Sequence, residues 1–164
     1  MQATPINQNL PLRSEGFGSL FEALEYAARG DSGFNFYDHS GQIEFILTYK
    51  QLLEEARVLA RKLTSLGFAR GSRVAIVADT DPLFHRFFFA CQLAGLVPVA
   101  VPADIQLGAH KAYASQVQRM LLACGAQIAV APVSHAPLLA EVAASLQLVL
   151  SGSPADFDAL PESA

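Results

Sequence analysis

Two carboxylates, Asp79 and Asp81, have the types and spacing that best fit a chemical role. They directly follow an apolar, strand-like run at 73–78, and open α/β sheets bind ligands at the carboxyl ends of their strands. There the pair could hold a metal ion or act as a general base. The alternative is structural, because Asp81 precedes Pro82, and aspartate before a proline in the first helical turn is a common N-cap. We interpret the pair mainly as helix capping.

His85 and Arg86 follow on the same predicted helix, beside three phenylalanines at 87–89. These side chains could line a substrate site. Aromatic side chains at helical spacing more commonly fill cores, so we expect core and inter-subdomain packing instead. On the next predicted helix, Tyr113 has the period of the core positions. The basic residues of that helix, expected on a solvated face, are Lys111 and Arg119.

The remaining candidate motifs are incomplete. Cys91 and Cys124 lie in apolar helical patterns, where a free cysteine is usually a small core residue. The four histidines are scattered without metal-ligand spacing. No GxxxxGK[ST] phosphate loop and no GxSxG nucleophile motif occurs, and the glycine-containing segments 15–18 and 151–154 lack the residues that complete a phosphate site. We therefore assign no catalytic, cofactor-binding or metal-binding residue.

Composition restricts the class of protein. Of the 164 residues, 52% are hydrophobic and 16% are charged, against roughly 25% charged in typical soluble domains. Such a chain is not disordered. All 11 lysine and arginine residues lie within 1–119, without a basic cluster, so we expect no nucleic-acid partner. The excess of apolar residues indicates that further protein covers part of this surface.

The sequence lacks the marks of export and of membrane insertion. Its first ten residues have neither the basic start nor the apolar run of a signal peptide. The uncharged stretch 120–140 is long enough to span a bilayer, but a glycine and two prolines interrupt it in a strand-then-helix pattern. We expect no transmembrane segment and a reducing, cytoplasmic setting.

The elements that must position these residues alternate along the chain. A helix with a capping box at Ser19, a β-hairpin over residues 34–47 and a helix with a capping box at Thr48 come first. Strands and helices then alternate, and Ser134 is predicted to cap the last helix. The strands are predicted at 73–78, 97–101, 127–131 and 148–150. Their apolar residues are continuous, which is typical of parallel strands covered on both faces.

These patterns predict an α/β fold with an open, mainly parallel sheet and helices on both faces, preceded by a helix and a β-hairpin. Three regions are expected. They are a flexible N-terminal segment at 1–16, an α/β subdomain at 17–150 and a polar, acidic tail or linker at 151–164.

Four segments, in order, resemble those of one enzyme family. They are Leu47–Leu52 (LTYKQL), Gly71–Val77 (GSRVAIV), Phe89–Pro102, which joins a helix to a VPVAVP strand, and Ala109–Leu122. From about Ser19 to Pro132 the sequence resembles the N-terminal part of adenylate-forming, AMP-binding acyl-activating enzymes. Within that family it is most similar to fatty-acyl-AMP ligases and acyl-CoA synthetases.

The resemblance implies a parent enzyme that uses ATP and Mg²⁺ to convert a fatty acid to acyl-AMP. The acyl group then passes to a carrier-protein thiol or to coenzyme A. The family's phosphate loop, adenine-binding segment, acidic ribose-binding residue and catalytic lysine have no match here. The resemblance implies that this chain is the opening part of the large N-terminal domain. It also implies that the chain is inactive alone and that its partner is the remainder of the enzyme.

Two other hypotheses stay open. The chain could be a free-standing, flavodoxin-like binding or interaction module that uses the loops near Asp79, 102–108 and Pro132. It could also be a self-associating structural domain, because exposed apolar faces attract partners.

Overall fold

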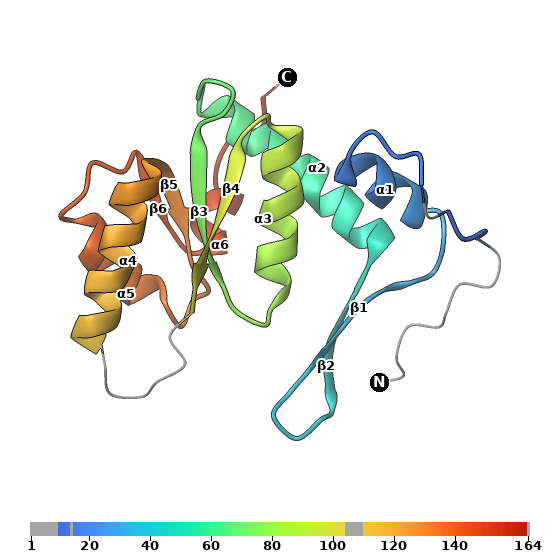
Figure 1. Cartoon of the computed structure of the whole chain (residues 1–164), viewed down its shortest axis with the longest axis horizontal. Coiled ribbons are helices and arrows are strands. Elements are labelled where there is room, and N and C mark those ends of the chain that lie inside the picture. The colour runs from blue at the N-terminus through green and yellow to red at the C-terminus, as the bar shows by residue number, and fades with distance from the viewer. Residues whose placement is uncertain (1–9, 14, 104–109, 164) are drawn as a thin grey trace.

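The computed structural model describes residues 10–13, 15–103 and 110–163. Its centre is a four-stranded sheet with the strand order β4-β3-β5-β6, in which all neighbouring strands pair in parallel (Figure 1). The strands are β3 (Arg73–Ala78), β4 (Val97–Pro102), β5 (Ala126–Val130) and β6 (Leu150–Gly152). The expected open parallel sheet is confirmed.

Helices cover both faces of this sheet, as expected. They are α2 (Tyr49–Ser65), α3 (Pro82–Leu93), α4 (His110–Cys124), α5 (Ala136–Ala143) and α6 (Pro154–Asp158). Side chains of β3 alternate between the two faces. Val74 and Ile76 join the core cluster formed with α2, α3 and Phe157 of α6, whereas Ala75 and Val77 join the cluster formed with α4 and α5.

A smaller unit precedes the sheet. It consists of helix α1 (Leu20–Ala27) and the antiparallel hairpin of β1 (Gly33–Tyr37) and β2 (Ile43–Thr48). Its buried cluster joins Leu24, Phe36 and Leu47 to Leu52 and Leu53 at the start of α2. Helix α2 therefore belongs to both units, because its later residues pack over the sheet. The predicted helix, hairpin and helix are confirmed.

The capping boxes predicted at Ser19 and Thr48 have different outcomes. The capping box of α2 is complete, since the Gln51 amide N–H donates to Thr48 Oγ1 and the Thr48 amide N–H donates to Gln51 Oε1, both at 3.1 Å. At α1 the Ser19 hydroxyl accepts from the Glu22 amide as predicted, but the Glu22 carboxylate accepts from the Gly18 amide at 2.7 Å. That capping box is therefore only half formed.

The predicted cap of α5 is wrong. The N-cap position is His135, and no side chain caps the helix there. Ser134 lies one residue too early, and its hydroxyl contacts His135 Nδ1 at 3.0 Å. The backbone supplies the first bonds instead, because the Ala136 amide donates to the Pro132 carbonyl. A proline within the first turn reduces the number of N–H groups that need a cap.

The segment 151–164, expected as a polar, acidic tail or linker, contains regular secondary structure. Its first residues complete β6, and α6 follows directly. Phe157 of α6 is 0% exposed and meets Phe87 of α3 edge-to-face, with ring centroids 5.1 Å apart. This one aromatic contact anchors a segment whose local composition is polar and acidic. The segment through Ser163 is part of the packed structure.

The flexible segment expected at 1–16 lies partly outside the described residues, which omit 1–9 and 14. The remainder contacts α1, since the Tyr26 hydroxyl donates to the Pro11 carbonyl at 2.6 Å. Among the described residues, no helix combines the length and the apolar character needed to cross a membrane.

Candidate functional site

In open α/β sheets, ligands bind beyond the carboxyl ends of neighbouring strands whose connections run in opposite directions, and β3 and β5 are such strands. The two strands are neighbours, but β3 continues into α3 on one face and β5 continues into α5 on the other. Such a switch in direction opens a crevice beyond the strand ends. Residues 79–81 and 131–135 follow these two strand ends.

The carboxylates on the β3 side serve the backbone. Asp81 is the N-cap of α3, and its Oδ1 accepts from the Leu83 amide at 2.9 Å. Asp79 Oδ1 accepts from the Thr80 amide at 2.7 Å. Burial raises the pKa of Asp81, against the lowering effect of the Leu83 and Phe84 amides. The capping interpretation is confirmed for Asp81.

The β5 side adds a hydroxyl and an imidazole, Ser134 and His135, in contact with each other. The His135 ring lies 6.3 Å from the ring of Tyr113, whose hydroxyl donates to the Pro102 carbonyl. The loop at 102–108, considered in the sequence as part of a site, lies outside the described residues from 104 onward. Within the described part of the chain, no three carboxylate, histidine or cysteine side chains gather as metal ligands would.

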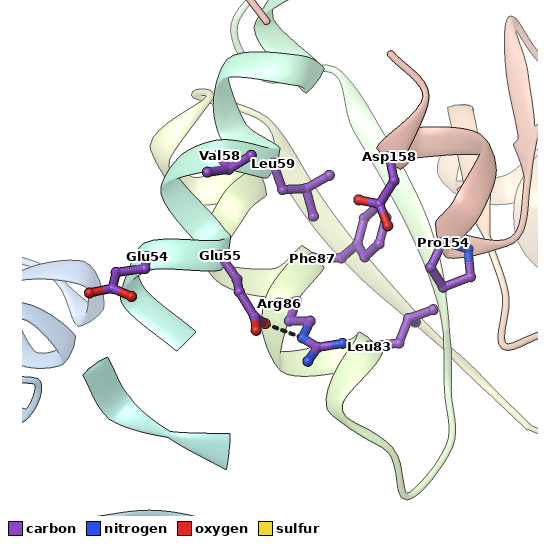
Figure 2. A pocket seen from close by; sticks show the side chains of 9 residues that line it. All are labelled: Glu54, Glu55, Val58, Leu59, Leu83, Arg86, Phe87, Pro154 and Asp158. Atoms are coloured by element: carbon purple, nitrogen blue, oxygen red, sulfur yellow. Dashed lines mark ion pairs between the residues drawn. The ribbon is translucent and has the colours of Figure 1, made fainter. Parts of the chain in front are cut away.

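A pocket of about 420 Å³ lies between α2, α3 and α6 (Figure 2). Its size falls within the range of ligand sites. Its apolar wall contains Leu59, Leu83 and Phe87, and its remaining lining residues are Glu54, Glu55, Val58, Arg86, Pro154 and Asp158. The sequence did not reveal this pocket, because its residues come from three segments and no local pattern connects them.

The charge of this pocket is unfavourable for an anionic ligand. It carries three carboxylates and one guanidinium, and Arg86 is already ion-paired with Glu55 across α2 and α3 (Figure 2). A fatty-acid carboxylate or an ATP phosphate would meet a net negative rim. We assign no catalytic step to this pocket.

His85 and Arg86 have the packing roles that the sequence predicted. The His85 ring lies 4.2 Å from the Phe34 ring and 5.7 Å from the Phe36 ring, centroid to centroid. Helix α3 thus packs against the hairpin through His85 and against α2 through Arg86. Burial among these rings lowers the pKa of His85, against the opposing effect of Asp81.

We expect stability to depend on pH through His85. A lowered folded-state pKa means that the unfolded chain binds the proton more readily, so stability is full above the ordinary pKa of 6.5 and falls as the pH drops below it. His85→Phe keeps an aromatic ring and removes the proton. Between about pH 7 and about pH 5, the urea midpoint of the wild type should fall more than that of His85→Phe. Equal slopes would contradict this role.

The other sequence candidates are structural. Cys91 is 0% exposed, and burial raises the pKa of its thiol to about 12, so it stays protonated and unreactive. Cys124 is half-buried and free. Tyr113 is in the core as predicted, and the exposed basic side chains of α4 are Lys111 and Arg119.

The two glycine-containing segments bind their own side chains. At 151–154, the Ser153 amide and hydroxyl both donate to Asp156 Oδ2, at 2.7 and 2.9 Å. These bonds lower the pKa of Asp156, so a carboxylate already occupies the position a phosphate would take. At 15–18, the Gly18 amide donates to Glu22. The interpretation that neither segment is a phosphate site agrees with these bonds.

Comparison with known proteins defines the class. The family model of AMP-binding enzymes matches residues 29–163. A Caulobacter vibrioides protein whose name proposes an acyl-CoA synthetase is 38% identical over the whole chain, which covers 28% of that protein. A solved structure from work on fatty acyl-adenylate ligases of E. coli and L. pneumophila is 36% identical, with a TM-score of 0.87 over 93% of this chain and 28% of its own.

The fold extends to more distant relatives. The adenylation domain of a keto acid-selecting NRPS module, 20% identical, superposes with a TM-score of 0.73 over 92% of this chain and 29% of its own. The chain belongs to the family of AMP-binding, adenylate-forming enzymes. It spans 28% of the length of the curated relative that it matches throughout.

Proposed function

We propose that these 164 residues form the opening part of an ATP-dependent enzyme that activates fatty acids as acyl-AMP. The observation that supports this most strongly is the likeness to a fatty acyl-adenylate ligase structure at 36% identity and a TM-score of 0.87. The family-wide fold alone would leave the substrate class open, because more distant members of the same fold differ in what they bind.

The whole enzyme would join a fatty-acid carboxylate to the α-phosphorus of ATP and release pyrophosphate. A thiol of a carrier protein or of coenzyme A would then take the acyl group and release AMP. Neutralising phosphate charge with Mg²⁺ is a general need of such transfers. The residues that act on ATP would belong to the part of the enzyme that this chain does not contain.

The role of this chain is then to build a scaffold. The sheet with its five helices forms one wall, in which the Glu55–Arg86 ion pair joins α2 to α3. The His85–Phe34 contact attaches the N-terminal hairpin to it. The carboxyl ends of β3 and β5 would face the substrate-binding part, because this is the side of the sheet where α/β folds bind ligands.

The product of the whole enzyme tests this proposal. Incubated with ATP, Mg²⁺ and a medium- or long-chain fatty acid, it should form acyl-AMP that mass spectrometry detects. Omitting the fatty acid or ATP is the control. Formation of an aminoacyl adenylate in place of a fatty acyl adenylate would overturn the substrate class, and no adenylate with any carboxylic acid would overturn the proposal.

A further inference from the structure

An apolar surface runs along one edge of the sheet. Strand β4 is an outer strand in the described part of the chain, and no charged residue occurs from Phe87 through Pro102. Val97 is 44% exposed, and Ala100 is also exposed. Figure 1 shows α3 beside this strand. We call the surface the β4 flank and define it by Phe84, Phe88, Val97, Val99 and Ala100. It wraps around the edge strand, because Ala100 lies on the face of the sheet that α3 covers, whereas Val97 and Val99 lie on the opposite face.

Two phenylalanines extend the β4 flank onto α3. The rings of Phe84 and Phe88, one turn apart, are stacked with centroids 5.7 Å apart, and both are only half-buried. Arg86 on the same helix pairs with α2. A step of two residues is roughly 200° around a helix. The stacked rings therefore lie on the side of α3 away from α2 and are not covered by it.

The backbone of β4 is poorly equipped to pair with a further strand. The Val97 amide donates to the Ser72 carbonyl at 2.8 Å, toward β3. Successive residues of a strand direct their backbone N–H and C=O groups to opposite sides. The backbone groups of Pro98, Ala100 and Pro102 therefore point away from β3, to the unpaired side of β4. The prolines have no N–H to donate, and the Pro102 carbonyl already accepts from the Tyr113 hydroxyl. Ala100 alone among the three offers a donor.

We propose that the β4 flank is an internal interface, covered by an apolar, uncharged surface of the same enzyme from outside these 164 residues. Contact is made by side chains, because the prolines block regular strand addition. A charged partner surface would lose its hydration without gaining an ion pair. The inference rests on the proposed function, and the matched relative has room for such a surface, since this chain covers only 28% of it.

Cysteine labelling of the whole enzyme tests the interface without a disruptive substitution. Val97→Cys and Ala100→Cys are made separately in a Cys124→Ser background, with Cys91 left buried. The control is Val149→Cys, since Val149 is 66% exposed and lies outside the flank. Each maleimide reaction rate is divided by the rate of the same variant unfolded in urea. We expect both flank cysteines to react at least about 100-fold more slowly than when unfolded, and the control to react within about tenfold.

If the flank cysteines react as fast in the folded enzyme as in the unfolded enzyme, the proposed interface is wrong. Slow labelling that becomes fast on dilution would also overturn it, because a second copy would then be the cover. Acyl-AMP formation, measured on the same samples, separates this inference from the proposed function. Slow labelling without acyl-AMP supports the interface and contradicts the function, whereas fast labelling with acyl-AMP contradicts the interface alone.

Discussion

Phe157→Ala is expected to unfold much of this chain or to lower its unfolding free energy by about 3–5 kcal/mol, the usual cost of removing a buried phenylalanine. The side chain is 0% exposed and belongs to the core cluster that joins α2, α3 and the sheet. Its edge-to-face contact with Phe87 is lost as well. Since domains of this size are stable by about 5–15 kcal/mol, the loss is a large fraction of the total.

Urea unfolding followed by circular dichroism measures this effect. Val149→Ala is the matched control, because that valine is 66% exposed and its truncation should change the free energy by less than about 0.5 kcal/mol. A Phe157→Ala variant as stable as the control would mean that α6 is a detachable tail. The polar composition of residues 151–164 led to that expectation.

Gly33→Ala is expected to disrupt the hairpin. A Cβ added at Gly33 would lie 2.2 Å from the Leu47 carbonyl oxygen and 2.5 Å from the Thr48 Cα, both on the paired strand. Backbone atoms cannot rotate away as a side-chain end can, so the first pair of the ladder must separate. Overpacking of this kind costs about 1–3 kcal/mol, and the effect extends to the cap of α2 because Thr48 is its N-cap.

Urea unfolding and limited proteolysis measure this second effect, and Gly18→Ala is the control. A Cβ at Gly18 meets only the Glu22 carboxylate end, at 3.3 Å, which can move. We expect faster cleavage between β1 and β2 in Gly33→Ala and unchanged cleavage in Gly18→Ala. Identical midpoints and cleavage rates for both variants would contradict the close approach of the strands at Gly33.

The sequence predicted the sheet well because each strand and helix there has its own local signal. Continuous apolar runs mark β3, β4 and β5, and Asp81–Pro82 marks the start of α3. The same reasoning did not find helix α6 within residues 151–164. There Phe157 is the buried side chain of the helix, and its contact partner Phe87 lies 70 positions earlier in the chain. Ser134 failed as a cap for a related reason, since the turn before α5 satisfies its own amides.

The candidate site was less accessible to the sequence than the fold. The roles of Asp81 and of the His85–Arg86 pair could be predicted from capping and from helical spacing. The pocket between α2, α3 and α6 could not, because it depends on how three separated helices meet. The three carboxylates that line it come together only through that geometry, and they make the pocket unfavourable for an anionic ligand.

Exchange of labelled pyrophosphate into ATP, measured side by side for the whole enzyme and for the 164-residue chain, tests the central claim most directly. The whole enzyme should catalyse exchange that depends on a fatty acid, because adenylate formation is reversible. The 164-residue chain at equal concentration should show none, because the residues proposed to act on ATP belong to the part of the enzyme that it does not contain. Fatty-acid-dependent exchange by the 164-residue chain alone would contradict the account of this chain as a scaffold.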